Sequence, residues 1–323
     1  MDLQYLHALQ GLRESLPSAV ESFFVMLSSL GEGPGLVAIM FIVFWCIDKR
    51  TGLFSLISFS FATFVGQFIK NIACVYRPWI RDPSIVPAAG AIEGATGYSF
   101  PSGHTTGTAS SLGGIAWYVR KNHKAVAAVC IVVVLLMMFS RNFLCVHTPQ
   151  DVLVGLLIAL VAIALTQLFL SWIDRYDALM PGHNKDIIVM VVVLALCVVA
   201  IVIVLVKPYP MDYVDGQLIV DPATMLKSTF EGVGVFAGLA IGWVLERRLV
   251  AFSTTGIDTR TRLIRFVVGI VIVGVVFVAT NYGFKAVLPN EWAKLLCFFL
   301  VVVSGTFVAP FAFNKLEQRR QAR

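Results

Sequence analysis

Between residues 70 and 151 the chain reads KNIACVYRP (residues 70–78), then PSGH (101–104), then SRNFLCVHTPQD (140–151), and the segments between them are mostly apolar. Each of these three polar segments adjoins a long apolar run. Runs of about 20 apolar residues predict helices that cross a membrane. The polar segments therefore mark places where such helices end or begin, and they determine how the rest of the chain is arranged around them.

The composition of the whole chain agrees with a membrane protein. Of the 323 residues, 58% are hydrophobic and 14% are charged, and the mean hydropathy is +0.83. A soluble domain is roughly 45–50% apolar and about 25% charged. The net charge of +6 does not indicate a nucleic-acid partner, because basic residues in such a chain mainly set its orientation in the membrane.

The predicted fold class is all-α: a polytopic helical membrane protein with about nine transmembrane helices. We expect no cleaved signal peptide, since the first residues lack a basic segment followed by an apolar core. The six cysteines show no CxxC pair and predict no disulfide or metal framework. The spans are expected near residues 34–48, 51–71, 104–119, 125–141, 150–173, 187–206, 231–249, 264–283 and 294–313.

Three parts of the chain are predicted. Residues 1–33 form an amphipathic or interfacial segment, in which 17–30 enters the membrane without crossing it, and the GEGPG sequence at 31–35 breaks the helix. Residues 34–186 form the helical core with all three polar segments, and 187–323 form an extension of about four helices.

Lysine and arginine predict the orientation, because they are enriched in cytoplasmic connections. They concentrate in connections on the side opposite the polar segments. The N-terminus and the three polar segments then face the extracytoplasmic side, and the C-terminus is cytoplasmic. The basic residues on the cytoplasmic side lie mainly at 49–50, 120–124, 247–248, 260–265 and 315–323.

The polar segments contain more cations than acids. Lys70, Arg77 and Arg141 are fixed cations near the membrane boundary, and Asp151 is their one obvious acidic partner. Such a surplus favours binding of an anion, and paired guanidinium donors suit phosphate oxygens. Residues 101–104 open a helix, where Ser102 and Gly103 can present a hydroxyl and unpaired amides to an oxyanion.

Two histidines supply groups that can react with a bound phosphate. His147 precedes Thr148, the expected N-cap, and Pro149, the first helical residue, so Asp151 can turn back to His147. A carboxylate on one ring nitrogen leaves the other as a nucleophile. His147 is then the nucleophile, and His104 is the acid that protonates the leaving oxygen and later the base that activates water.

The motifs Lys-x6-Arg-Pro, Pro-Ser-Gly-His and Ser-Arg-x5-His-x3-Asp, in this order, resemble the three-part signature of the type 2 phosphatidic acid phosphatase (PAP2) superfamily. The resemblance spans roughly residues 34–173. It implies a phosphohistidine intermediate, no metal or other cofactor, and a site on the outer face. Matched by position, His147, His104 and Asp151 resemble the catalytic residues, and Ser140 and Pro78 are secondary candidates. The residues that resemble phosphate binders are Lys70, Arg77, Ser102, Gly103 and Arg141.

Simpler interpretations exist for most of these residues taken singly. Asp151 also fits a capping box with Thr148, and Lys70 and Arg141 fit anchors that reach toward the interface. The loop 79–100 is either an irregular lid or the segment that selects the group beyond the phosphate.

The function predicted is an integral membrane phosphatase of the bacterial cytoplasmic membrane. It would hydrolyse a lipid phosphomonoester or diphosphate, such as an isoprenyl diphosphate or a phosphatidate-like lipid, at the extracytoplasmic face. The predicted partners are a phosphorylated lipid and membrane lipids, with no nucleic acid. The alternatives are phosphotransfer to a lipid or sugar acceptor, and a phospholipid binder or transporter without enzymatic activity.

Overall fold

The computed structural model describes residues 2–31, 34–179, 184–214 and 216–321. Glu32 and Gly33 of the predicted helix breaker, and residues 180–183 of the predicted connection between core and extension, lie outside these ranges. The elements are α1 (Asp2–Ser15), α2 (Ser18–Leu30), α3 (Pro34–Ile42), η1 (Val43–Ile47), α4 (Lys49–Ala73), α5 (Pro78–Arg81), α6 (Ala89–Ile92), α7 (Gly103–Val119), α8 (Lys124–Phe143), α9 (Pro149–Leu179), α10 (Asn184–Val206), β1 (Tyr213–Val214), β2 (Gln217–Leu218), α11 (Pro222–Leu245), η2 (Glu246–Val250), α12 (Thr259–Lys285), α13 (Asn290–Val303), η3 (Ser304–Val308) and α14 (Ala309–Gln321).

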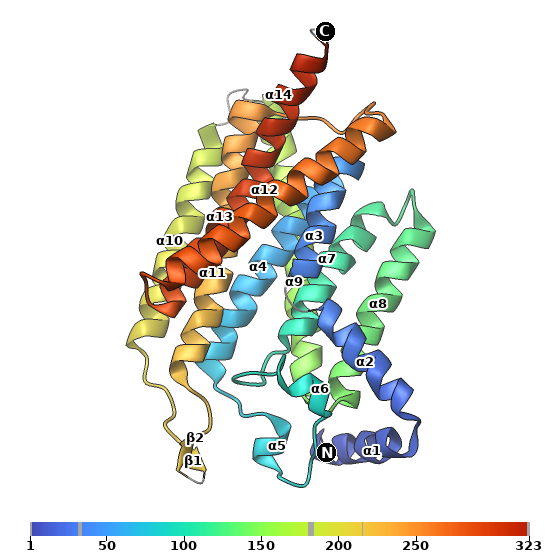
Figure 1. Cartoon of the computed structure of the whole chain (residues 1–323), viewed down its shortest axis with the longest axis vertical. Coiled ribbons are helices and arrows are strands. Elements are labelled where there is room, and N and C mark those ends of the chain that lie inside the picture. The colour runs from blue at the N-terminus through green and yellow to red at the C-terminus, as the bar shows by residue number, and fades with distance from the viewer. Residues whose placement is uncertain (1, 32–33, 180–183, 215, 322–323) are drawn as a thin grey trace.

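The predicted all-α membrane architecture is confirmed. The long helices run roughly along one axis, and the two-residue strands β1 and β2 form a small hairpin at one end (Figure 1). Within the described residues, seven helices are long and apolar enough to cross a membrane, and α2 with α3 would make an eighth if that bent pair is one span. The 17-residue helix α7 occupies the remaining predicted segment.

At the N-terminus, helices α2 and α3 are bent by 57° relative to each other across a short break. Such a pair is either one broken span or a re-entrant loop, so the entry of 17–30 into the membrane without crossing stays a prediction. Helix α1 lies across the end of the bundle near α5 and α6 (Figure 1). Polar contacts join it to the chain there, with Arg81 donating to Asp2 at 3.1 Å and His7 Nε2 lying 3.1 Å from Asp82 Oδ2.

Helix starts follow from local side-chain caps. The Asp48 carboxylate accepts from the Thr51 amide at 2.7 Å where α4 begins, and Ser102 accepts from the Thr105 amide at 3.4 Å where α7 begins. A capping side chain satisfies an amide that has no partner within the helix. These caps fix the ends of the core helices, and the end that carries the polar segments lies opposite the C-terminus (Figure 1).

The extension packs tightly through small residues. Helices α11 and α13 lie side by side (Figure 1), and a β-carbon added at Gly238 would lie 2.7 Å from the Phe299 carbonyl oxygen. One at Gly234 would collide with the Leu295 carbonyl, and one at Gly242 with the Thr306 hydroxyl. The glycines at four-residue spacing therefore allow close helix approach, as expected for membrane helices.

Ionic contacts hold the far end of the bundle. Lys49 donates to Glu246 at 2.7 Å, which joins the start of α4 to the end of α11. Arg265 of α12 donates to Glu317 of α14 at 2.8 Å. These pairs connect helix ends away from the three polar segments.

We predict that Gly238→Val lowers the thermal stability of the purified protein. The valine side chain meets backbone rather than a flexible side chain, and overpacking of this kind costs about 1–3 kcal/mol. The apparent Tm in detergent measures the effect. The control is Gly274→Val on α12, where an added β-carbon meets nothing within 4 Å. Equal Tm changes for the two variants would contradict the packing described for α11 and α13.

Candidate active site

The three polar segments meet in one cavity of ≈ 340 Å³. The cavity lies where α4 ends and α7 begins, with the segment before α9 at its edge. Because the residues come from segments far apart in the sequence, the helix ends must converge as the sequence predicts. Five predicted site residues line it: Lys70, Arg77, Gly103, His104 and His147.

The cavity walls bury ionisable side chains deeply. The exposed fraction is 7% for Lys70, 4% for Arg77 and 2% for both His147 and Asp151. Buried ions at membrane depth are costly unless they have polar partners. Each of these side chains does have such partners. The cluster is therefore a buried polar site, and its side chains do not reach toward water as interfacial anchors do.

His147 lies between a cation and an anion. Its Nε2 atom is 2.9 Å from Nη1 of Arg77, and its Nδ1 atom is 3.4 Å from Oδ2 of Asp151. Arginine can only donate hydrogen bonds, so Nε2 must carry the lone pair. The proton of a neutral ring then lies on Nδ1, facing Asp151. This tautomer presents an unprotonated nitrogen to the cavity.

Burial lowers the pKa of His147 well below its ordinary value, and the Arg77 cation lowers it further. Asp151 opposes this shift without outweighing it. His147 is therefore neutral at a pH where an exposed histidine is already charged.

Asp151 is held by several donors. It accepts from the Thr148 amide at 2.8 Å, and the Asp151 amide donates to the Thr148 hydroxyl at 3.4 Å. This is the capping box that the sequence allowed, and it coexists with the contact to His147. The same carboxylate thus starts α9 and orients the imidazole.

The two cations on the first polar segment are fixed by backbone oxygens. Lys70 donates to the Tyr98 carbonyl at 3.0 Å. Arg77 donates to the carbonyls of Gly97 at 3.1 Å, Thr96 at 3.1 Å and Val146 at 2.9 Å. Neutral carbonyl partners do not neutralise either side chain, and the Asp151 carboxylate nearby sets one negative charge against their two positive charges. This balance favours an anion in the cavity.

The start of α7 forms another part of the wall. Gly103 and His104 line the cavity, and Ser102 is fully buried behind them as the N-cap. A β-carbon at Gly103 would come no closer than 4.0 Å to Gln67, so the glycine leaves the helix start open on that side. The first amides of α7 can therefore meet an oxyanion.

The remaining candidates lie behind the cavity wall. Arg141 is fully buried, and its Nε atom donates to the Ser140 hydroxyl at 3.2 Å. Ser140 in turn donates to the Met137 carbonyl at 2.7 Å. Pro78 is the first residue of α5 and is buried. None of these three is among the residues that line the cavity, and the phosphate-binding role expected for Arg141 stays a prediction.

Ser99 belongs to the site and was not predicted from the sequence. Its hydroxyl donates to Asp151 Oδ2 at 2.5 Å and lies 3.3 Å from Nδ1 of His147. Its amide donates to the Val75 carbonyl at 2.7 Å. The loop 79–100 therefore contributes a side chain that positions the pair of His147 and Asp151, which is more than an irregular lid would do. The one feature of the sequence that could have indicated this role is the position of Ser99 just before the PSGH segment.

The extension is attached to the site through Asn71, the neighbour of Lys70. The Asn71 amide group donates to the Met225 carbonyl at 3.2 Å and to the Thr229 hydroxyl. Its side-chain oxygen accepts from the Tyr209 hydroxyl at 2.9 Å. Helix α11 and the segment before it therefore hold the end of α4 in place.

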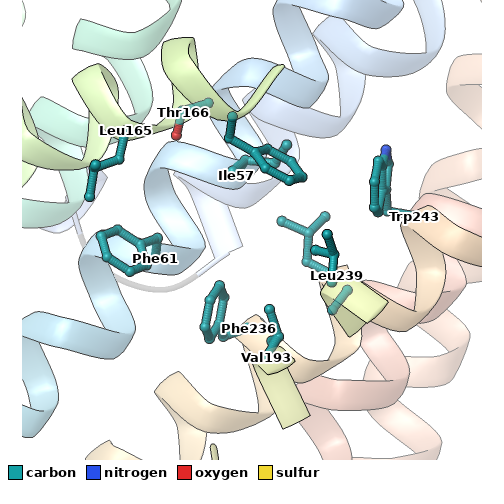
Figure 2. A pocket seen from close by; sticks show the side chains of 11 residues that line it. Ile57, Phe61, Leu165, Thr166, Val193, Phe236, Leu239 and Trp243 are labelled. Carbon is teal, nitrogen blue, oxygen red and sulfur yellow. The ribbon is translucent and has the colours of Figure 1, made fainter. Parts of the chain in front are cut away.

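A second cavity, of ≈ 190 Å³, lies between α4, α9, α10 and α11. Figure 2 shows that it is walled by Ile57, Phe61, Leu239 and other apolar side chains, with the Thr166 hydroxyl as a polar group among them. It contains no ionisable residue among those that line it. It therefore differs from the first cavity, whose lining includes Lys70, Arg77 and His147.

The fold and the site define an integral membrane protein with a buried cationic site. In comparisons with known families, residues 51–175 match the model of the PAP2 superfamily. Residues 230–321 match the model described as PAP2 superfamily phosphatase, transmembrane extension. Together the matches cover about two thirds of the chain, which belongs to the PAP2 superfamily and is a membrane phosphatase. No curated protein and no solved structure matches the chain.

These matches identify the extension, which the sequence patterns alone did not explain. The PAP2 match begins within α4 and ends within α9, so it contains every predicted site residue. Helix α10 lies between the two matched ranges.

We predict that His147 remains neutral to a pH clearly below the ordinary histidine pKa of about 6.5. Between the lowered pKa of folded His147 and the ordinary value, His147 binds a proton more readily in the unfolded chain. The free energy of unfolding therefore falls as the pH falls through this range. NMR of protein labelled at its histidines, five in all, measures the titration, and His147→Gln assigns the signal. Titration of that signal at or above pH 6.5 would contradict the environment described.

Proposed function

We propose that the protein hydrolyses a phosphorylated lipid through a phosphohistidine on His147, at the extracytoplasmic face of a bacterial cytoplasmic membrane. The observation that carries the proposal is the single cavity in which the Nε2 lone pair of His147 lies beside Arg77, with Lys70, Gly103 and His104 in the same wall. A phosphate bound by Arg77 would have its phosphorus next to that nitrogen.

In the first step His147 Nε2 attacks phosphorus, and the bond from phosphorus to the leaving oxygen breaks. His104 gives its proton to that oxygen. Asp151 stabilises the positive charge that develops on the imidazole. In the second step water attacks phosphorus, the P–N bond breaks, His104 takes a proton from the water, and inorganic phosphate leaves. Lys70, Arg77 and the α7 amides stabilise the charge on the equatorial oxygens.

These steps use groups of the protein alone, and the proposal assigns no role to a metal. The described residues include no cluster of three or more His, Cys, Asp or Glu side chains that could hold a metal ion. A lipid substrate fits because the cavity lies at the ends of membrane helices, and its deeper wall includes apolar side chains such as Phe59 and Val235.

We predict that a phosphoenzyme forms in the wild type and accumulates in His104→Ala. The leaving group of an aryl phosphate needs no proton, so the first step still proceeds in this variant. Hydrolysis of the phosphohistidine is slow, because His104 is no longer there to act as the base. Labelled phosphate retained on the denatured protein measures the intermediate. Turnover of a lipid phosphate by the same variant is expected to fall by about 10²–10⁴.

Two further variants complete this experiment. His147→Ala is expected to insert normally but to retain no label and release no phosphate. His123→Ala, a matched control at an exposed turn, should behave as the wild type. Turnover of His147→Ala near the wild-type rate would remove the covalent step.

The predicted sidedness has its own test. Ser84 is exposed in the loop near the site, and Gln318 is exposed at the opposite end of the bundle. A membrane-impermeant maleimide should label Ser84→Cys in intact cells and should label Gln318→Cys only after lysis, with the parent chain as the background. The reverse pattern would place the site on the cytoplasmic side.

A further inference from the structure

The walls of the active-site cavity change character with depth along α4. One face of this helix presents Lys70, then Gln67, Thr63 and Phe59 to the cavity. These positions are three or four residues apart, so they lie on successive turns. Lys70 makes the wall cationic at the mouth. About one helical turn (~5 Å) deeper, Gln67 offers hydrogen-bonding groups, and the wall becomes apolar at Phe59.

Helix α11 of the extension forms the opposite wall of the cavity, and positions along it can be assigned to depths along α4. Met225 lies opposite Asn71, because the Asn71 amide donates to the Met225 carbonyl at 3.2 Å. A β-carbon at Gly232 would lie 3.6 Å from Cγ of Gln67. The side chain of Glu231, the neighbour of Gly232, therefore enters the cavity at about the depth of Gln67, below the phosphate-binding groups.

The middle layer offers hydrogen-bond acceptors. Glu231 lines the cavity with 32% of its side chain exposed, and its carboxylate lies 3.6 Å from Nζ of Lys294. That separation is an ion pair longer than a hydrogen bond, so the carboxylate oxygens can accept from a ligand. Gln67 Oε1 is buried and has no hydrogen-bond partner within the part of the chain that the structure describes.

We propose that Glu231 and Gln67 select a lipid monophosphate that carries a hydroxyl or amine close to its phosphate. This inference rests on the function proposed above and narrows its substrate class. The phosphate occupies the layer of Lys70 and Arg77, the donor group meets the two acceptors, and the hydrocarbon chain follows Phe59 and Val235 inward. A second phosphate placed in the middle layer would meet the Glu231 carboxylate, so a diphosphate is disfavoured.

The test compares two substrates that differ in one donor group. They are a single-chain 1-acyl-glycerol 3-phosphate with its free 2-hydroxyl, and the 2-deoxy analogue with the same chain and phosphate. Wild-type kcat/KM is expected to be at least about tenfold higher for the hydroxyl compound, since a polar site loses its partner with the analogue. A 2-amino analogue shows whether an ammonium serves as well as a hydroxyl.

Glu231→Leu is expected to reduce this substrate ratio to within about twofold, because the main acceptor is gone. Glu291→Leu is the matched control, since Glu291 lies on α13 of the same extension and does not line the cavity; it should keep the wild-type ratio.

The outcomes separate the two proposals. Equal wild-type turnover of the hydroxyl and deoxy compounds overturns the inference and leaves the phosphatase function standing. The same ratio in Glu231→Leu as in the wild type also overturns it. Failure to hydrolyse any of the lipid phosphates overturns the proposed function and the inference with it. The wild-type comparison needs no substitution, so it does not depend on the folding of a variant.

Discussion

The contact between Arg77 and His147 is the interaction on which the site depends. A guanidinium that donates to Nε2 at 2.9 Å is compatible only with an unprotonated nitrogen, and Asp151 on the other side of the ring fixes the proton there. Both partners of His147 are themselves held in place. Arg77 is bound to three carbonyls, and Asp151 is bound by Ser99 and Thr148. The loop 79–100 and the start of α9 therefore act together to hold the His147 ring with Nε2 unprotonated.

The extension is part of this arrangement, although its residues follow the PAP2 match in the sequence. Asn71 connects the end of α4 to Met225 and Thr229 of α11, and Lys207 donates to the Asn71 carbonyl at 2.7 Å. The glycine face of α11 lets α13 approach closely behind it. Helix α11 thus supports the end of α4 that lines the cavity and also contributes Glu231 to the cavity wall, which is the basis of the substrate selection proposed above.

The sequence predicted what depends on local pattern. The helical architecture followed from apolar runs, and the start of α9 followed from Thr148, Pro149 and Asp151, whose preferences act within one turn. The convergence of the polar segments followed from alternate crossing of the membrane. Ser99 could not be predicted, because its contact depends on how an irregular loop folds back to Val75. The buried position of Arg141, behind the wall, depends on packing that no local pattern encodes.

The contact between α4 and α11 could not be predicted from the sequence either, since Asn71 and Met225 are separated by more than 150 residues. The angle between α2 and α3 was not predicted either, because apolar composition alone does not show how two short helices are oriented.

The central claim is that His104 and His147 act on opposite sides of one phosphate. An experimental structure of the protein with bound orthovanadate, which adopts the geometry of phosphoryl transfer, tests it most directly. The account predicts vanadium bonded to Nε2 of His147, an apical oxygen facing His104, and equatorial oxygens on Lys70, Arg77 and the Gly103 amide. Vanadate bound elsewhere, or the two imidazoles opening into separate cavities, would contradict it.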